Sequence, residues 1–301
     1  MRTRTIPGAL LALALPLALP LSLGAQQKVD IARATAKDVA VTLQGPFARL
    51  NIVAWAFDSV SITGTLMHGA QIENVFAGDP GLRPKGAKVY IRGPEDMVKG
   101  GTVIEMRVPR SARVWVKGGI SEVTVAGITG EIDVSLVGGW VTVDGNPRVA
   151  NLEAMDGRVT FDGAASRLNM KTAAGNILAR GRALDASFYS VSGNVRVDAV
   201  LERGKFETLS GTITYAGELA RGAALTFNTH DGAIDVMLGG KPDVVINATT
   251  MQGTIENLFT SKSASTRRDG RGQELELELA FGDGRVDVTS FKGNIRLGRA
   301  K

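Results

Sequence analysis

Glycine recurs at a constant interval through the middle of this chain, and a valine or isoleucine stands two residues after each of these glycines. The strict series is Gly139, Gly157, Gly175, Gly193 and Gly211. The same pairing of glycine with a β-branched residue continues outside the strict period at Gly130, Gly232, Gly253, Gly284 and Gly293. A short, fixed period of this kind is typical of architectures that stack repeated units. The repeat therefore constrains the fold before any other feature does.

Each unit, here called a coil, follows a strand pattern. Polar and apolar residues alternate after the glycine, as in Arg158-Val159-Thr160-Phe161, which is the pattern of a strand with one buried face. Glycine suits the corner that precedes this strand, because the chain there needs a positive φ or a close approach of two backbones. A second strand precedes each glycine. We therefore expect two strands of about six residues and two corners in each coil.

Stacking such coils predicts two buried columns of side chains. One wall would carry the Val and Ile residues, and the other would carry a ladder of Phe188, Phe206 and Phe227. The predicted fold class is all-β, a single-stranded β-solenoid or β-helix-like stack of coils about 18 residues long, preceded by a small irregular β cap. The alternative is a sandwich of antiparallel hairpins, since a nine-residue strand spacing also suits hairpins.

The domain boundaries follow from where the register holds. We predict a signal peptide at 1–25, an N-terminal β cap at 26–100 that lacks the register, and a β-solenoid domain at 101–301. The coils lengthen after Gly211, and a polar, basic run at 260–273 is predicted to be a mobile loop. The closing strands, Glu274–Phe281, Val286–Val288 and Asn294–Leu297, are expected to cap the open end of the stack.

The N-terminus has the pattern of a targeting segment. Arg2 and Arg4 precede an apolar run from Ala9 to Leu23, and small residues follow, which predicts export and cleavage after Ala25. The alternative, a retained membrane anchor, is disfavoured because the run is short and contains two prolines. We expect no transmembrane anchor in the mature chain, which would be periplasmic, on the cell surface or secreted.

Charge and cysteine content narrow the function classes. The net charge of +5 falls to +3 without residues 1–25, and cations and anions are interspersed, so no nucleic-acid partner is expected. The chain has no cysteine, which excludes disulfides and a lipid-modified cysteine at the N-terminus. Its two histidines, His68 and His230, stand apart in sequence and predict neither a catalytic triad nor a metal site. We expect no cofactor and no metal.

From about Gly101 to Leu297 the chain resembles the bacterial putative-adhesin domain of unknown function, a toastrack-type β-solenoid family. The resemblance rests on a strand ending in Val108-Pro109, the following Arg113–Gly118 segment, and repeats such as Ser192-Gly193-Asn194-Val195 and Ser210-Gly211-Thr212-Ile213. It implies an exported, envelope-associated β-solenoid with an adhesive role or a role in envelope-stress circuits. It implies no catalytic residues.

Outward positions on the two walls hold amides, hydroxyls and a few cations, with few acids. Paired-carboxylate hydrolysis needs two acids close together, so we predict that the chain is not an enzyme. The predicted function is an envelope-associated module for binding, adhesion or structure, whose partner is an envelope glycan or envelope protein. A polysaccharide-active β-helix enzyme and a periplasmic component of envelope-stress sensing remain the alternatives. The candidate ligand-binding residues on the outward wall are Trp140, Arg158, Asn176, Asn194 and Arg196.

Overall fold

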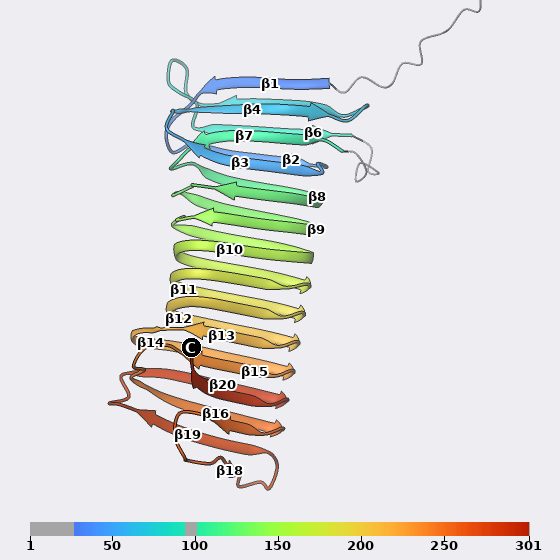
Figure 1. The fold of residues 1–301 in the computed structure, drawn as a ribbon. Coiled ribbons are helices and arrows are strands. Elements are labelled where there is room, and N and C mark those ends of the chain that lie inside the picture. The colour runs from blue at the N-terminus through green and yellow to red at the C-terminus, as the bar shows by residue number, and fades with distance from the viewer. Residues whose placement is uncertain (1–26, 94–100, 301) are drawn as a thin grey trace, which may run out of the picture.

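The computed structural model describes residues 27–93 and 101–300. These residues form strands and no helix, and all the strands belong to one mixed sheet (Figure 1). The all-β prediction is therefore confirmed. The strands are β1 Gln27–Ala34, β2 Ala40–Gly45, β3 Arg49–Trp55, β4 Ser59–Leu66, β5 Gln71–Ala77, β6 Gly86–Arg92, β7 Val103–Pro109, β8 Arg113–Ala126, β9 Glu131–Gly145, β10 Val149–Ala174, β11 Ile177–Ser192, β12 Val195–Ser210, β13 Ile213–Gly217, β14 Leu219–Asp231, β15 Ile234–Leu238, β16 Val244–Gln252, β17 Ile255–Asn257, β18 Ser265–Thr266, β19 Gln273–Leu279, β20 Gly284–Lys292 and β21 Ile295–Arg299.

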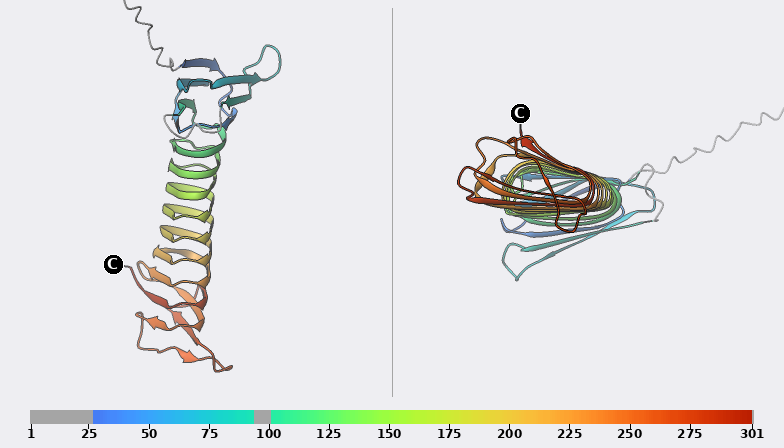
Figure 2. Two further views of the ribbon diagram at one scale, coloured as in Figure 1. Left: turned by 90° about the vertical axis from the view of Figure 1, so that its right-hand side faces the viewer. Right: turned by 90° about the horizontal axis from the view of Figure 1, so that it is seen from below.

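The central coils stack in parallel with the register that the repeat predicts. Val159 of β10 pairs with Ile177 of β11, which pairs with Val195 of β12. The pairing partners are one repeat apart in sequence, so each coil lies directly on the one before it (Figures 1 and 2). The parallel pairing differs from the antiparallel hairpins of a sandwich.

The coils of β11 and β12 each contain one long strand where two short ones were expected, whereas the next two coils have two separate strands each, β13 with β14 and β15 with β16. β11 runs from Ile177 to Ser192 without a break and bends through the corner after Gly181. Only the corner at Gly193 interrupts it. The bend keeps its ladder pairing because Gly181 lies against Gly163 of the preceding coil. The second corner is therefore a curve within a strand.

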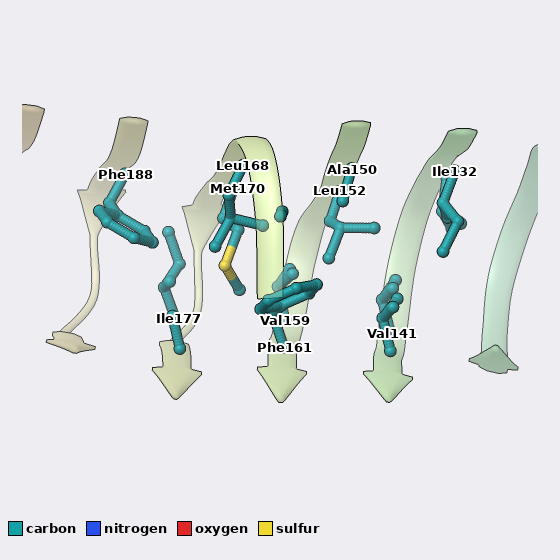
Figure 3. Packing of buried hydrophobic residues seen from close by; sticks show 14 of the residues in the cluster. Ile132, Val141, Ala150, Leu152, Val159, Phe161, Leu168, Met170, Ile177 and Phe188 are labelled. Carbon is teal, nitrogen blue, oxygen red and sulfur yellow. The ribbon is translucent and has the colours of Figure 1, made fainter. Parts of the chain in front are cut away.

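The core lies between two walls, which Figure 3 shows from close by. We call wall A the side whose buried column includes Val141, Val159 and Ile177, and wall B the side that carries the phenylalanine ladder. The Phe188 and Phe206 ring centroids are 5.0 Å apart, and those of Phe206 and Phe227 are 4.3 Å apart. All of these side chains are at most 1% exposed, so both predicted columns are confirmed as core.

The N-terminal third joins the same stack. β2 and β3 pair in parallel with β8, with Val41 opposite Val114 and Ile52 opposite Val125. Antiparallel strands lie beyond them, since β1 pairs with β4 and β5 pairs with β6. The boundary predicted at residue 101 stays a prediction, but parallel pairing already begins in the segment named as a cap.

The C-terminal coil, β20 and β21, does not cap the stack as the sequence predicted. Phe227 of β14 pairs with Val288 of β20, and Val288 pairs in turn with Ala248 of β16. The last coil is therefore inserted between two coils that precede it in the chain. β19 closes this end by pairing antiparallel with β16, so only the first of the three closing strands lies where it was expected. Phe206 pairs with Phe227 of the next coil, which stands more than 18 residues later in the chain. The predicted lengthening of the coils after Gly211 is therefore confirmed.

The basic run at 260–273 contains β18, whose Ser265 and Thr266 pair with β19. Lys262 Nζ donates a hydrogen bond to the backbone oxygen of Glu276 at 2.6 Å, so this run is attached to the stack. The predicted signal peptide lies outside the described residues. Within the described part of the chain, no helix has the length and apolar character needed to cross a bilayer.

Candidate functional site

Four of the five predicted binding residues form one column on the outer face of wall A. Trp140 is 60% exposed and pairs in register with Arg158. The Oδ1 of Asn176 accepts a hydrogen bond from the backbone N–H of Asn194 at 3.0 Å. The Oδ1 of Asn194 accepts one from the N–H of Thr212, also at 3.0 Å. These two amides therefore connect successive coils, and their oxygens are already occupied.

The fifth predicted residue, Arg196, lies in the neighbouring column of wall A. Its Nε donates to Oδ2 of Asp198 at 3.1 Å, an exposed ion pair within one strand. The structure thus brings Trp140 and Arg158 together as an open surface, while Arg196 has an acidic partner. An asparagine directly after a corner glycine is the sequence signal for a side-chain amide that connects two coils. It recurs at Asn294, whose Oδ1 accepts the N–H of Thr254.

Wall B carries a ladder of polar side chains that sequence reasoning did not single out. The Nδ2 of Asn151 donates to Oδ2 of Asp133 at 3.2 Å, and the Nδ2 of Asn169 donates to Oδ1 of Asn151 at 2.8 Å. These residues stand one repeat apart and are half-buried. The signal that could have found them is an outward polar residue at the same place in three consecutive coils. Because each amide is fixed by its neighbour, the ladder is preorganised.

The ladder lines an open hollow of about 420 Å³ on wall B. Ser187, Glu153 and Lys171 line the same hollow. The hollow thus receives one carboxylate from Glu153 and one ammonium group from Lys171. The hollow therefore presents amide, hydroxyl, carboxylate and ammonium groups on a rigid strand surface, an arrangement suited to binding a polar ligand.

Another open hollow, of about 690 Å³, contains acids that are relevant to the enzyme alternative. It lies at the second corner of the stack and includes Asp243 and Asp283. The Oδ1 of Asp243 accepts the backbone N–H groups of Asp283 at 3.1 Å and Phe281 at 2.9 Å. The hydrogen bond from Asp283 is the main cause that lowers the pKa of Asp243. Asp283 itself pairs with Arg221 at 3.4 Å.

A catalytic acid needs a pKa raised toward the working pH, whereas the pKa of Asp243 is lowered. Asp243 therefore holds the turn at 281–283 through these two hydrogen bonds. In addition, the described residues contain no group of three histidine, aspartate or glutamate side chains that could hold a metal ion.

Three solved structures are similar to this chain at low identity. A protein from Bacteroides fragilis described as a "putative adhesin" has a TM-score of 0.45 and 11% identity, covering 92% of this chain and 99% of that chain. A "putative cell adhesion protein" from Clostridium sporogenes has a TM-score of 0.23 and 8% identity, covering 92% and 99%. A "putative lipid binding protein" from Parabacteroides distasonis has a TM-score of 0.39 and 13% identity, covering 93% and 98%.

No family model matches the chain. No curated protein matches it either. The predicted resemblance is thus met in part, by structural similarity to two bacterial proteins described as adhesion proteins. Similarity at these TM-scores says nothing about activity or ligand, so the function must be inferred from the surface of this chain.

Proposed function

We propose that this chain is an exported, non-catalytic β-solenoid that serves as a binding module of the bacterial envelope. Its ligand is an extended polar molecule, an envelope glycan, held along wall B. The observation that carries the proposal is the hydrogen-bonded ladder Asp133–Asn151–Asn169 on the floor of a solvent-open hollow. Export is supported by the N-terminal pattern of residues 1–25 alone.

The stack gives such a ligand a regular surface. Neighbouring coils lie about 4.8 Å apart, so the polar groups of Asn151, Asn169 and Ser187 repeat at a constant interval along the wall. A polymer with repeated hydroxyls can hydrogen-bond to several of them at once, and several weak contacts then combine into useful affinity. The carboxylate of Asp133 accepts the Nδ2 hydrogen bond of Asn151, which fixes it in the ladder and favours a binding role for it over that of a catalytic acid in the polysaccharide-active enzyme.

The test is co-sedimentation of the full-length chain with insoluble envelope polysaccharide, with released sugar assayed in the same tube. We expect saturable binding without sugar release. The double change Asn151→Ala and Asn169→Ala should weaken binding about tenfold, because it removes hydrogen bonds from two coils. The matched variant on wall A, Arg158→Ala with Arg196→Ala, should bind as the wild type does.

Each other outcome would overturn a specific part of the proposal. Loss of binding in the wall A variant alone would return the site to the residues predicted from the sequence. Release of sugar would establish the enzyme alternative. Absence of binding by the wild type would exclude the glycan role and point to a protein partner, as in envelope-stress sensing.

A further inference from the structure

A second open groove, of about 460 Å³, lies on wall B toward the C-terminal end of the stack. Two adjacent columns of outward side chains from successive coils form its floor. The polar column holds Tyr189, Glu207, Asn228, Thr289 and Thr249. The second column, which we call the apolar column, holds the apolar side chains of Leu209, Phe291 and Met251 together with the imidazole ring of His230. Each apolar side chain of the floor therefore has a hydrogen-bonding neighbour two residues away in the same strand.

The centre of the groove is a pair of coplanar rings. His230 and Phe291 stack with their centroids 4.9 Å apart and their planes at 4°. They meet because β20 is inserted beside β14, which places Phe291 next to His230 across the ladder. Phe291 is 43% exposed and Leu209 is 53% exposed. Apolar side chains kept at the surface in consecutive coils indicate a binding surface and not core.

A cationic segment borders the rings. Residues 260–273 carry four cations and a single acid, and Arg267 lines the groove directly. The Nη1 of Arg267 lies 2.8 Å from Sδ of Met251, and its Nη2 lies 3.3 Å from Oδ2 of Asp269. These contacts hold the guanidinium at the edge of the apolar column. The groove thus combines a mainly apolar column, a hydrogen-bonding column and a border segment with an excess of cations. Two of its charges have partners, since Arg267 pairs with Asp269 and Glu207 pairs with Lys205.

We propose that this groove is a subsite for an acidic sugar unit. The C–H face of a sugar ring would stack on the His230–Phe291 pair, and its hydroxyls would bond to Asn228 and Thr249. Its anionic group would face Arg267. A sugar ring has one apolar face and a polar edge, which matches the paired columns of the floor. This inference rests on the proposed function and names the chemical class of the ligand: an anionic glycan.

The test is isothermal titration calorimetry of the full-length chain with three probes. These are tetragalacturonate, the neutral maltotetraose, and inorganic phosphate. We expect tetragalacturonate to bind at least about tenfold more tightly than maltotetraose, with the preference shrinking as salt rises. Phosphate alone should not bind measurably, because it lacks the ring face. Equal affinity for the two tetrasaccharides would contradict the acidic preference, and phosphate binding as tight as tetragalacturonate would reduce the groove to an anion site.

Phe291→Ala should weaken tetragalacturonate binding about tenfold, because a central aromatic contact is lost. The matched control is Phe281→Ala, which removes a 92% exposed phenylalanine from the turn at the second corner and should leave affinity unchanged. Arg267→Ala is a second probe that leaves the ring pair in place, and its affinity for tetragalacturonate should fall to that for maltotetraose. Wild-type affinity in both groove variants would overturn the proposal.

The outcomes also separate this inference from the proposed function. Loss of tetragalacturonate binding in Phe291→Ala, with retention in the Asn151→Ala and Asn169→Ala variant, would support an independent subsite. Envelope polysaccharide that sediments with a chain unable to bind tetragalacturonate would refute the groove alone. Failure of both assays would refute both.

Discussion

Replacing Gly175 by alanine is expected to lower the free energy of unfolding by at least about 3 kcal/mol. A Cβ at this position would lie 1.7 Å from the carbonyl oxygen of Gly157 in the preceding coil and 2.7 Å from its carbonyl carbon. Both contacts are with backbone, so no side-chain rotation can relieve them. The two coils would have to separate locally, which would break ladder hydrogen bonds on both sides of the corner.

The matched control for this prediction is Gly119→Ala in β8. A Cβ there would meet no atom within 4 Å, so we expect a change within about 0.5 kcal/mol. The measurement is the urea-unfolding midpoint of each variant and of the wild type. Similar midpoints for Gly175→Ala and Gly119→Ala would contradict the close approach of coils at the glycine corner.

The glycine column shows how much of the fold a sequence repeat can predict. The contact that makes glycine necessary joins each corner to the same corner one coil away, so the interval between glycines in sequence is also the step between coils in space. A second glycine column at Gly145, Gly163 and Gly181 follows the same rule. A Cβ added at Gly163 or Gly181 would lie 1.8 or 1.9 Å, respectively, from the carbonyl oxygen of the preceding glycine. Ala199 takes the next place in this column, so the second glycine repeat is too short to stand out in the sequence.

The order of coils could not be predicted in the same way. The even spacing of Phe206, Phe227 and Ala248 in the sequence suggests that their coils are consecutive neighbours, yet Val288 lies between Phe227 and Ala248. Local alternation of polar and apolar residues determines which side chains face the core. It does not determine which coils are neighbours, because coils with the same alternation present the same pattern of backbone hydrogen-bonding groups to an adjacent coil.

The candidate sites depend both on the local alternation of polar and apolar residues and on the order in which the coils stack. The sequence predicted outward positions that are polar with few acids, yet Asp133 and Glu153 bring two carboxylates to the hollow on wall B. It could not predict that the oxygens of Asn176 and Asn194 are used between coils, since that requires the conformation of the corner. The His230–Phe291 pair could not be predicted from the sequence either, because the two rings meet only when β20 is inserted beside β14.

The second large loss of stability is expected for Val288→Asp, a change in the inserted coil. Val288 is fully buried between Phe227 and Ala248. An aspartate there would bury a carboxylate without a partner, and the free energy of unfolding should fall by about 3–5 kcal/mol. Because β20 supports β14 on one side and β16 on the other, the damage should reach residues 244–252. Amide hydrogen exchange would detect it as lost protection in that segment.

The neighbouring residue provides the control, since Thr289 points outward from the same strand and is exposed. Thr289→Asp should change stability by no more than about 0.5 kcal/mol and keep residues 244–252 protected. If the last coil were an end cap, Val288→Asp would expose only residues 284–299, because β16 would rest directly on β14. Retained protection of 244–252 in Val288→Asp would therefore contradict the inserted order, whereas joint loss of protection in β16 and β20 follows from it.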